Sequence, residues 1–425
     1  MIKRTRSLSF QSIALAAAAA IAQLMVALIF VLAARGTDPE SLGRVVSMIA
    51  IGVTLAGILD FGSNARVSRD IARGDVTHQI ISNQLTTKIL LVSIGCLVIG
   101  LFLKFAINLG DQWGCSFIAF TTLVAQTLQG PIRGLRRAHI IGIVMLIDRS
   151  TVLAAFMTLT SIGVGSAYSL WMALSLGPLV AAIVSFAFTP KDLRIALRGW
   201  KPRNPWTRSI SFGASNVFIS LQGLDVTILK MIGGASAAGL YGAVSKWTQP
   251  ISIVAGAFAS ASAPFVAHAG NLTEAWRSMR RAVWLPGLAI LIAILIAIGA
   301  PVLVPFLIGD SYSKSAEVLT ILAIAAIPAV LNQTFFVSLQ NLGRDRAAAV
   351  VLACIIVIQL LFIVAFGSVF GAVACAFAWL ICQFLQVVCF GYLIRNEVKK
   401  TSRDTEMPGQ IQLNPLSIET IDDTH

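Results

Sequence analysis

Charged residues are scarce in this 425-residue chain: they make up 12% of it, whereas 57% of its residues are hydrophobic. Such a composition excludes an ordinary soluble domain and indicates a chain that uses lipid as its solvent. Backbone amides in hydrocarbon must be hydrogen-bonded within their own segment, so apolar runs of about 20 residues predict membrane-spanning helices. We therefore expect an all-α integral membrane protein.

Catalytic and nucleotide-binding motifs are also lacking. The sequence has no P-loop, no HExxH pair and no nucleophile elbow, so ATP is not an evident energy source. The six cysteines lack metal-ligand or disulfide-framework spacing and read as small hydrophobic residues. We therefore expect no metal, no cofactor and no enzyme activity.

Long apolar segments account for most of the chain. Twelve can be drawn, at 12–34, 42–63, 83–105, 114–130, 140–162, 168–189, 210–232, 238–262, 283–305, 317–338, 347–366 and 371–394. An even number of spans places both termini on the same side of the membrane.

Basic residues alternate between the connections of these segments. If the N-terminus is cytoplasmic, every cytoplasmic connection is rich in arginine and lysine, and the opposite connections hold only Arg35, Lys104 and Lys314 at their edges. This is the positive-inside pattern, which predicts two cytoplasmic termini. It also explains the net charge of +13 without any nucleic-acid partner.

The connection from Pro190 to Ser209 is long and basic, and it separates two blocks of six segments. We therefore expect an N-terminal six-helix bundle over 1–200, including the start of this linker, and a C-terminal six-helix bundle over 201–396. The polar residues 397–425 are predicted to form a disordered cytoplasmic tail.

Ionisable side chains inside predicted spans are candidates for function because each is costly to insert into lipid. Arg149 lies near the middle of the fifth segment, too deep to reach the surface easily, and its neighbour Asp148 points about 100° away around the helix. Arg149 then needs an anionic ligand, a cavity or an acid on another helix. Lys88 and Lys230 lie nearer to helix ends, where a lysine can also extend to the interface.

Asp225 and Lys246 lie equally far from the centre of a predicted turn at 233–238, so they should lie at similar depth and interact. On the same segment, Asn216, Ser220, Gly223, Thr227 and Lys230 form one polar stripe that faces either a cavity or a neighbouring helix. Asp60 lies near the end of the second segment, where either water or an ion pair with Arg66 or Arg69 would satisfy its carboxylate.

The candidate site residues fall into three groups. Candidate substrate-binding residues are Arg149, Lys246, Lys230 and Lys88. Candidate coupling or gating residues are Asp225, Asp60 and Asp148. Arg133, Arg136 and Arg137 are candidates for substrate access at the cytoplasmic mouth, although the positive-inside rule explains them equally well.

Four segments in matching order resemble polysaccharide flippases of the Wzx type, within the multidrug/oligosaccharidyl-lipid/polysaccharide exporter superfamily. They are LDFGSNARVSRDIA at 59–72, DVTILKMIGGASAAGLYGAVSKW at 225–247, FLIGDSYSKSAEVLTIL at 306–322 and QNLGRDRAA at 340–348. The resemblance implies an alternating-access transporter with two six-helix bundles around a central cavity.

The same resemblance implies a function and a location. It implies that an undecaprenyl-pyrophosphate-linked oligosaccharide moves across the bacterial cytoplasmic (inner) membrane for polysaccharide biosynthesis, such as exopolysaccharide, alongside glycosyltransferases and a polymerase. Arg149 best fits a cationic cavity that receives pyrophosphate. A proton or sodium ion could couple the movement.

Three alternatives remain open. A multidrug or cation exporter of the same superfamily would have acids as its dominant deep charges, and here acids and bases are mixed. A lipid II flippase is disfavoured because the two extra helices of that group are missing. An O-antigen polymerase, which is an enzyme, is disfavoured by the short external connections.

Overall fold

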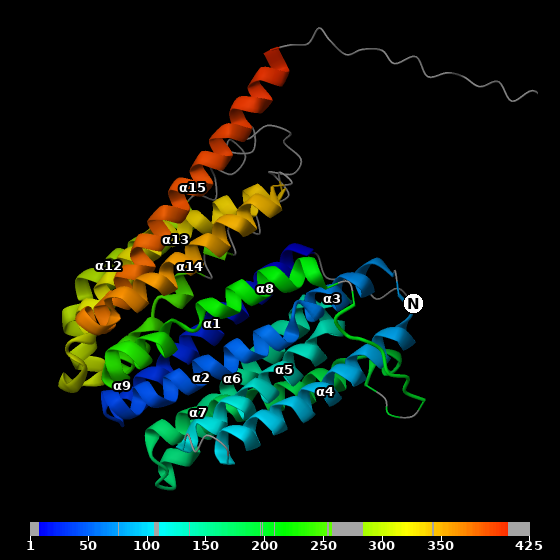
Figure 1. The fold of residues 1–425 in the computed structure, drawn as a ribbon, viewed down its shortest axis with the longest axis horizontal. Coiled ribbons are helices and arrows are strands. Elements are labelled where there is room, and N and C mark those ends of the chain that lie inside the picture. The colour runs from blue at the N-terminus through cyan, green and yellow to red at the C-terminus, as the bar shows by residue number, and fades with distance from the viewer. Residues whose placement is uncertain are drawn as a thin grey trace, which may run out of the picture.

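The computed structural model describes residues 8–74, 76–105, 110–135, 137–195, 197, 199–207, 209–252, 255–256, 284–341 and 344–406. Within these ranges the chain forms thirteen α-helices and no strand (Figure 1). The helices are α1 (Leu8–Arg35), α2 (Pro39–Asp60), α3 (Ser63–Arg73), α4 (His78–Phe105), α5 (Gly114–Gly134), α6 (Ala138–Ser161), α7 (Ser166–Phe188), α8 (Ile210–Gln222), α9 (Asp225–Ser245), α12 (Trp284–Ile308), α13 (Ser315–Asn341), α14 (Asp345–Phe370) and α15 (Ala372–Glu406). The expectation of an all-α membrane protein is confirmed.

Ten stretches of the described helices are long and apolar enough to cross a membrane. Two differences explain why ten stretches qualify where twelve segments were expected. Helix α5 does not qualify because it is rich in threonine and glutamine, yet its 21 residues rise about 31 Å and match a bilayer core. Many of its side chains are buried by other helices, so it needs less apolar sequence than a lipid-facing helix. The second difference lies in Asn216–Ser245, which counts once although the chain reverses within it.

The reversal takes place at Gly234, whose φ of 88° and ψ of 166° interrupt α9. The Tyr241 hydroxyl donates a hydrogen bond of 2.9 Å to the Asp225 carboxylate. Sixteen residues of straight helix would separate these groups by about 24 Å, so the two arms must run side by side. The turn expected at 233–238 is therefore confirmed, and the eighth expected segment extends beyond the part of the chain that the structure describes.

The connections define two ends of the molecule. The basic end carries α3, the connection from α5 to α6 and the long linker after α7. The short-loop end carries the turns at 36–38, 162–165, 234 and 309–314. Helix α2 begins at this end because the Asp38 carboxylate accepts a hydrogen bond of 2.9 Å from the Ser41 amide, as a helix N-cap does.

The two halves of the chain meet most extensively where α2 packs against α9. A Cβ atom at Gly43 would overlap the carbonyl oxygen of Ala235, and one at Gly239 would overlap that of Pro39. Backbones can approach this closely only where both helices present glycine. The pair Gly43 and Gly239 thus forms a glycine seam between α2 and α9.

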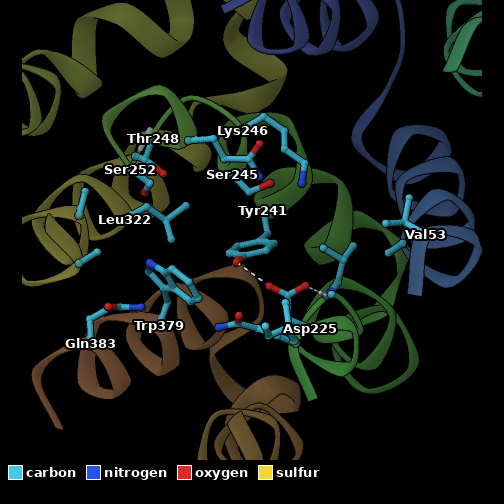
Figure 2. A pocket seen from close by; sticks show the side chains of 18 of the residues that line it. Val53, Asp225, Tyr241, Ser245, Lys246, Thr248, Ser252, Leu322, Trp379 and Gln383 are labelled. Carbon is cyan, nitrogen blue, oxygen red and sulfur yellow. Dashed lines mark hydrogen bonds between the residues drawn. The ribbon is translucent and has the colours of Figure 1, made fainter. Parts of the chain in front are cut away.

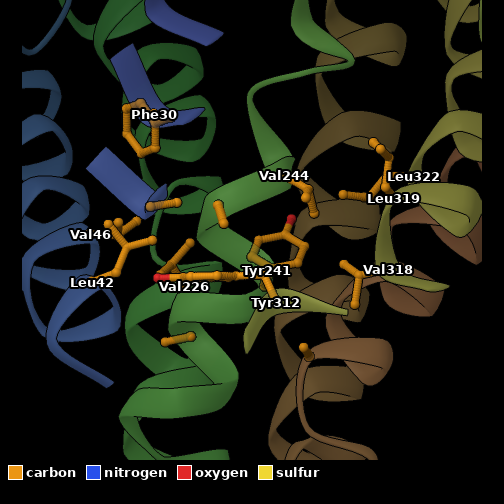
Figure 3. Packing of buried hydrophobic residues seen from close by; sticks show 14 of the residues in the cluster. Phe30, Leu42, Val46, Val226, Tyr241, Val244, Tyr312, Val318, Leu319 and Leu322 are labelled. Atoms are coloured by element: carbon orange, nitrogen blue, oxygen red, sulfur yellow. The ribbon is translucent and has the colours of Figure 1, made fainter. Parts of the chain in front are cut away.

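The largest buried apolar cluster lies beside this seam and joins both halves (Figure 3). Figure 3 shows Phe30 and Leu42 from the first two helices near Tyr241 and Val318 from the second half. The Tyr312 hydroxyl also donates a hydrogen bond of 3.0 Å to the Thr37 carbonyl across the turns of the short-loop end. The described helices are therefore closed together at this end, whereas α13 and α15 diverge from α1 and α8 toward the basic end (Figure 1).

The linker after α7 is fastened to the first half. The Trp206 indole donates to the Leu59 carbonyl at 3.0 Å, and the Trp200 indole donates to the Thr87 hydroxyl at 3.0 Å. The Arg66 guanidinium donates to the Thr207 carbonyl at 2.5 Å. The chain thus leaves the first half only at α8, which itself packs against α2.

The C-terminal boundary differs from the prediction. Helix α15 continues to Glu406, so the first ten residues of the expected disordered tail are helical. Polar residues can extend a helix once an apolar face has nucleated it. The remainder, 407–425, lies outside the described residues.

Candidate functional site

A cavity of about 630 Å³ lies between α1 and α2 on one side and α8, α9 and α13 to α15 on the other. Its apolar wall comes from the first half, with Phe30, Val46 and Ile49 among its members. Its polar groups all come from the second half: Gln222, Asp225, Tyr241, Ser245, Lys246, Thr248, Gln249, Ser252, Asn332, Gln333, Trp379, Gln383 and Gln386. The cavity is therefore asymmetric: the first half lines it with apolar side chains, and the second half supplies its hydrogen-bonding side chains.

Asp225 and Lys246 both line this cavity (Figure 2). Their charges interact electrostatically, but no ion pair within 4.0 Å joins them. The Asp225 carboxylate is held instead by the Tyr241 hydroxyl and by the Val226 amide, at 2.9 and 2.6 Å. The predicted shared depth is thus correct, whereas the direct partner of Asp225 is a tyrosine that the sequence analysis did not single out.

Arg149 has a nearer acid than expected. Its guanidinium lies 3.5 Å from the carboxylate of Asp148, the neighbour that helix geometry had directed elsewhere. The arginine side chain is long enough to reach the carboxylate of the preceding residue, and α7 packs closely against the same carboxylate, since a Cβ at Gly177 would overlap Asp148 Oδ1. The expectation that Asp148 points away from Arg149 is therefore wrong.

Arg149 is not part of the described cavity lining, but it is close to it. Its charge acts on Lys246, so the two cations share one electrostatic environment beside the cavity. With an exposed side-chain fraction of 27%, the guanidinium retains donors that the single contact to Asp148 does not use.

Lys88 and Asp60 form a buried pair away from the cavity. The Lys88 ammonium, with 2% of its side chain exposed, is 2.5 Å from the Asp60 carboxylate. It also donates to the Ser63 hydroxyl at 2.6 Å and to the Asn64 side-chain oxygen at 2.9 Å. Three satisfied donors leave Lys88 no proton for a substrate, so the pair joins α2, α3 and α4. Extension of Lys88 to the interface and solvation of Asp60 by water are therefore wrong, and the ion partner of Asp60 is Lys88 rather than Arg66 or Arg69.

Lys230 and the polar stripe of the seventh segment face α2. The Asn216 amide donates to the Gly57 carbonyl at 2.7 Å, and the Thr54 hydroxyl donates to the Ser220 carbonyl at 3.0 Å. Lys230 is half-buried near Arg44 and outside the cavity lining. The stripe therefore packs mainly against a neighbouring helix, while its member Gly223 also lines the cavity.

The arginines expected at the cytoplasmic mouth lie at the basic end. Arg133 is exposed, with a hydrogen bond of 3.2 Å to Gln129, and Arg137 is exposed at the start of α6. Arg136 lies outside the described residues. Nothing in the described ranges brings Arg133 or Arg137 into the central cavity.

The amide side chains of the cavity carry no charge, so the cost of a buried charge, which marks Asp225 and Lys246 in the sequence, does not mark them. Trp379, Gln383 and Gln386 follow one another at i, i+4 and i+7, which places them on one face of α15. That spacing of polar groups in an apolar segment was the available signal. No group of three or more histidine, cysteine or acidic residues suited to a metal occurs in the described part of the chain.

These features define a class of protein: a helical membrane protein whose two halves enclose a cavity and are closed together at one end. A family model described as polysaccharide biosynthesis protein matches residues 11–269, and the chain belongs to this family. The resemblance to Wzx-type flippases is confirmed at this level. None of the curated protein sequences matches the chain.

Solved structures of MATE family transporters share the fold. An inward-facing multidrug resistance MATE family transporter of the MOP superfamily is 16% identical, with a TM-score of 0.68 over 90% of this chain and 96% of that one. An outward-facing MATE family transporter is 14% identical, with a TM-score of 0.55 over 92% and 96%. The eukaryotic MATE transporter AtDTX14 is 14% identical, with a TM-score of 0.56 over 94% and 97%.

Proposed function

We propose that the protein flips a lipid-linked oligosaccharide, with its head carried through the central cavity and its lipid tail left in the bilayer. The observation that carries the proposal is the position of Lys246 in the cavity without a direct ion pair, beside the charge of Arg149. Two cations that share one environment suit a pyrophosphate, which spreads two or more negative charges over adjacent groups.

In this proposal Arg149 acts on the site through its positive charge. Its planar guanidinium suits a phosphate oxygen better than an ammonium does. Asp225 is the candidate coupling residue because it is the acid in the described lining. A proton or sodium ion bound there would change the charge beside Lys246 and thereby the hold on the pyrophosphate. Undecaprenyl pyrophosphate is the expected carrier lipid.

The same proposal fixes the setting. The basic end faces the cytoplasm by the positive-inside rule, both termini lie on that side, and the membrane is the bacterial inner membrane. Glycosyltransferases would deliver the substrate at the basic end, and a polymerase would receive it at the short-loop end. The described helices diverge toward the basic end, which is the arrangement needed to receive a substrate from the cytoplasm (Figure 1).

Reconstitution tests the function. Undecaprenyl pyrophosphate that carries a fluorophore-labelled N-acetylhexosamine is placed in vesicles with the purified protein, and dithionite reports the fraction in the outer leaflet. Wild-type protein should speed the equilibration of the labelled lipid between the two leaflets. With Lys246→Gln this equilibration should be at least tenfold slower than with the wild type. Lys104→Gln, an exposed lysine on α4 outside the cavity, is the matched control.

Three outcomes would contradict the proposal. Equilibration no faster than in protein-free vesicles would remove the flippase function. Export of an organic cation by the same vesicles would favour the multidrug alternative, for which the deep acid Asp225 is the supporting observation. Movement only of a lipid-linked muropeptide would favour a lipid II flippase.

A further inference from the structure

The uncharged side of the cavity is formed by carboxamides and one indole. Gln383 and Gln386 on α15 are buried to 7% and 8% exposure and still line the cavity, and Trp379 lies one turn before Gln383 on the same face. Figure 2 shows Trp379 and Gln383 side by side on α15, across from Lys246 and Ser245. Buried polar side chains are costly in an apolar helix unless they are paired, so this row requires an explanation.

Asn332 on α13 fixes the orientation of Gln383. Its amide nitrogen donates both to the Gln383 carbonyl at 2.9 Å and to the Gln383 side-chain oxygen at 2.7 Å. Because the Gln383 oxygen is occupied, its amide nitrogen is left to donate elsewhere. Asn332 is 3% exposed, lines the cavity and has a side-chain oxygen with no partner among the described residues. The pair therefore leaves one donor and one acceptor unused beside the cavity.

This combination is suited to a sugar ring. Carboxamides both donate and accept, as hydroxyl and acetamido groups do, so each can satisfy a sugar substituent in either sense. The indole offers a rigid apolar surface, which loses little conformational entropy on binding. The face of a sugar ring that carries C–H groups can pack against it. Asp225 and Lys246 are the charged groups of the described lining, so the row from Trp379 to Gln386 is electrically neutral.

We propose that Trp379, Gln383 and Gln386, with Asn332 as a positioning residue, form a subsite for an uncharged sugar of the transported head group. The inference rests on the proposed function and deepens it, because it assigns the sugar and the pyrophosphate to different walls of one cavity. Lys246 holds the phosphate, and the face of α15 holds the glycan. The carrier lipid without sugar then uses only the first of these contacts.

The test compares two probes on the detergent-purified full chain: undecaprenyl pyrophosphate, and undecaprenyl pyrophosphate that carries one N-acetylglucosamine. Gln383→Leu and Gln386→Leu should each weaken binding of the sugar-bearing probe about tenfold, the upper range for one lost hydrogen bond. Binding of the sugar-free probe should stay unchanged. Lys246→Gln should weaken both, and Gln79→Leu, an exposed glutamine on α4, should affect neither.

Two further variants separate recognition from folding. Trp379→Phe keeps an aromatic face and should retain most of the binding, whereas Trp379→Ala should lose it for the sugar-bearing probe alone. Equal losses for both probes, or none, in the α15 variants would overturn the subsite while the flippase function remained. If wild-type protein binds neither probe, the proposed function fails and the subsite fails with it.

Discussion

Two lysines in apolar segments of this protein have different surroundings. Lys88 is fully paired by Asp60, Ser63 and Asn64, whereas Lys246 lines a cavity without a direct ion pair. Both are lysines in apolar segments, and hydropathy alone gives them the same interpretation. What separates them is the neighbouring helices, because the end of α2 and the start of α3 bring Asp60, Ser63 and Asn64 onto Lys88 of α4.

Removal of the Lys88 charge should destabilise the protein. Lys88→Met leaves the Asp60 carboxylate buried without its counter-charge, which should cost about 3 kcal/mol or more and lower the thermal unfolding temperature. Lys104→Met, an exposed lysine on the same helix, is the control and should have little effect. The double variant Lys88→Met with Asp60→Asn should recover part of the loss. Equal thermal unfolding temperatures for Lys88→Met and Lys104→Met would show that the pair of Lys88 and Asp60 contributes nothing to stability.

At the scale of elements, the motifs that carried the family resemblance are junctions between helices. Phe61 and Gly62 have positive φ of 44° and 68° and turn the chain from α2 into α3. Gly234 reverses α9, and Gly309, at a φ of 114°, leads to the Tyr312 turn. Sequence similarity therefore identified where the chain bends. It did not reveal that two of these junctions close the short-loop end together with α2.

The glycine seam should be intolerant of even one methyl group. Gly43→Ala places a Cβ against the Ala235 carbonyl and should push α9 away from α2. A cysteine introduced at Ile49 in a cysteine-free background should then react faster with an impermeant maleimide applied from the short-loop side. Gly95→Ala, where a Cβ meets no atom within 4 Å, is the matched control. Unchanged reactivity in Gly43→Ala would mean that the seam does not seal this end.

The contact between Tyr312 and Thr37 should depend on pH only under alkaline conditions. Burial and the nearby Asp38 carboxylate raise the pKa of the Tyr312 phenol, so the hydroxyl stays a donor at neutral pH. Its stabilising effect is fully present below about pH 10 and falls as the pH rises through the folded-state pKa. The labelling rate of Ile49→Cys is divided at each pH by the rate for the denatured protein, which removes the ionisation of the thiol itself. Tyr312→Phe should increase this ratio at neutral pH and should abolish any alkaline rise of the ratio seen in the parent. A rise of the ratio near neutral pH in the parent would contradict this assignment.

For the whole molecule, the sequence was sufficient to predict the fold class, the paired halves and the turn at Gly234. Hydrophobic length and the distribution of arginine report interactions with the bilayer, which act on each segment separately. The cavity could not be predicted in the same way. Its lining combines residues from seven helices, and many of its polar side chains are neutral amides that no charge-based rule marks.

The orientation of the molecule in the membrane remains a prediction with a direct test. Single cysteines in a cysteine-free background at Ser313, on the short-loop end, and at Ala72, on the basic end, are both at exposed positions. In intact cells an impermeant thiol reagent should label Ser313→Cys and spare Ala72→Cys until the membrane is permeabilised. The reverse pattern would place the basic end outside and would remove the cytoplasmic loading of the cavity.

The glycine seam also bears on how this protein can diverge. Gly43 and Gly239 lie on different halves of the chain, yet each faces backbone atoms of the other helix, so neither position can gain a side chain alone without moving both helices. Most pairs of positions this far apart in sequence drift independently. Among descendants of one ancestral gene these two should remain glycine together, or should change together with a wider spacing of α2 and α9. The face of α15 that we propose as a sugar subsite lies apart from this seam, so its side chains are free to change at a different pace.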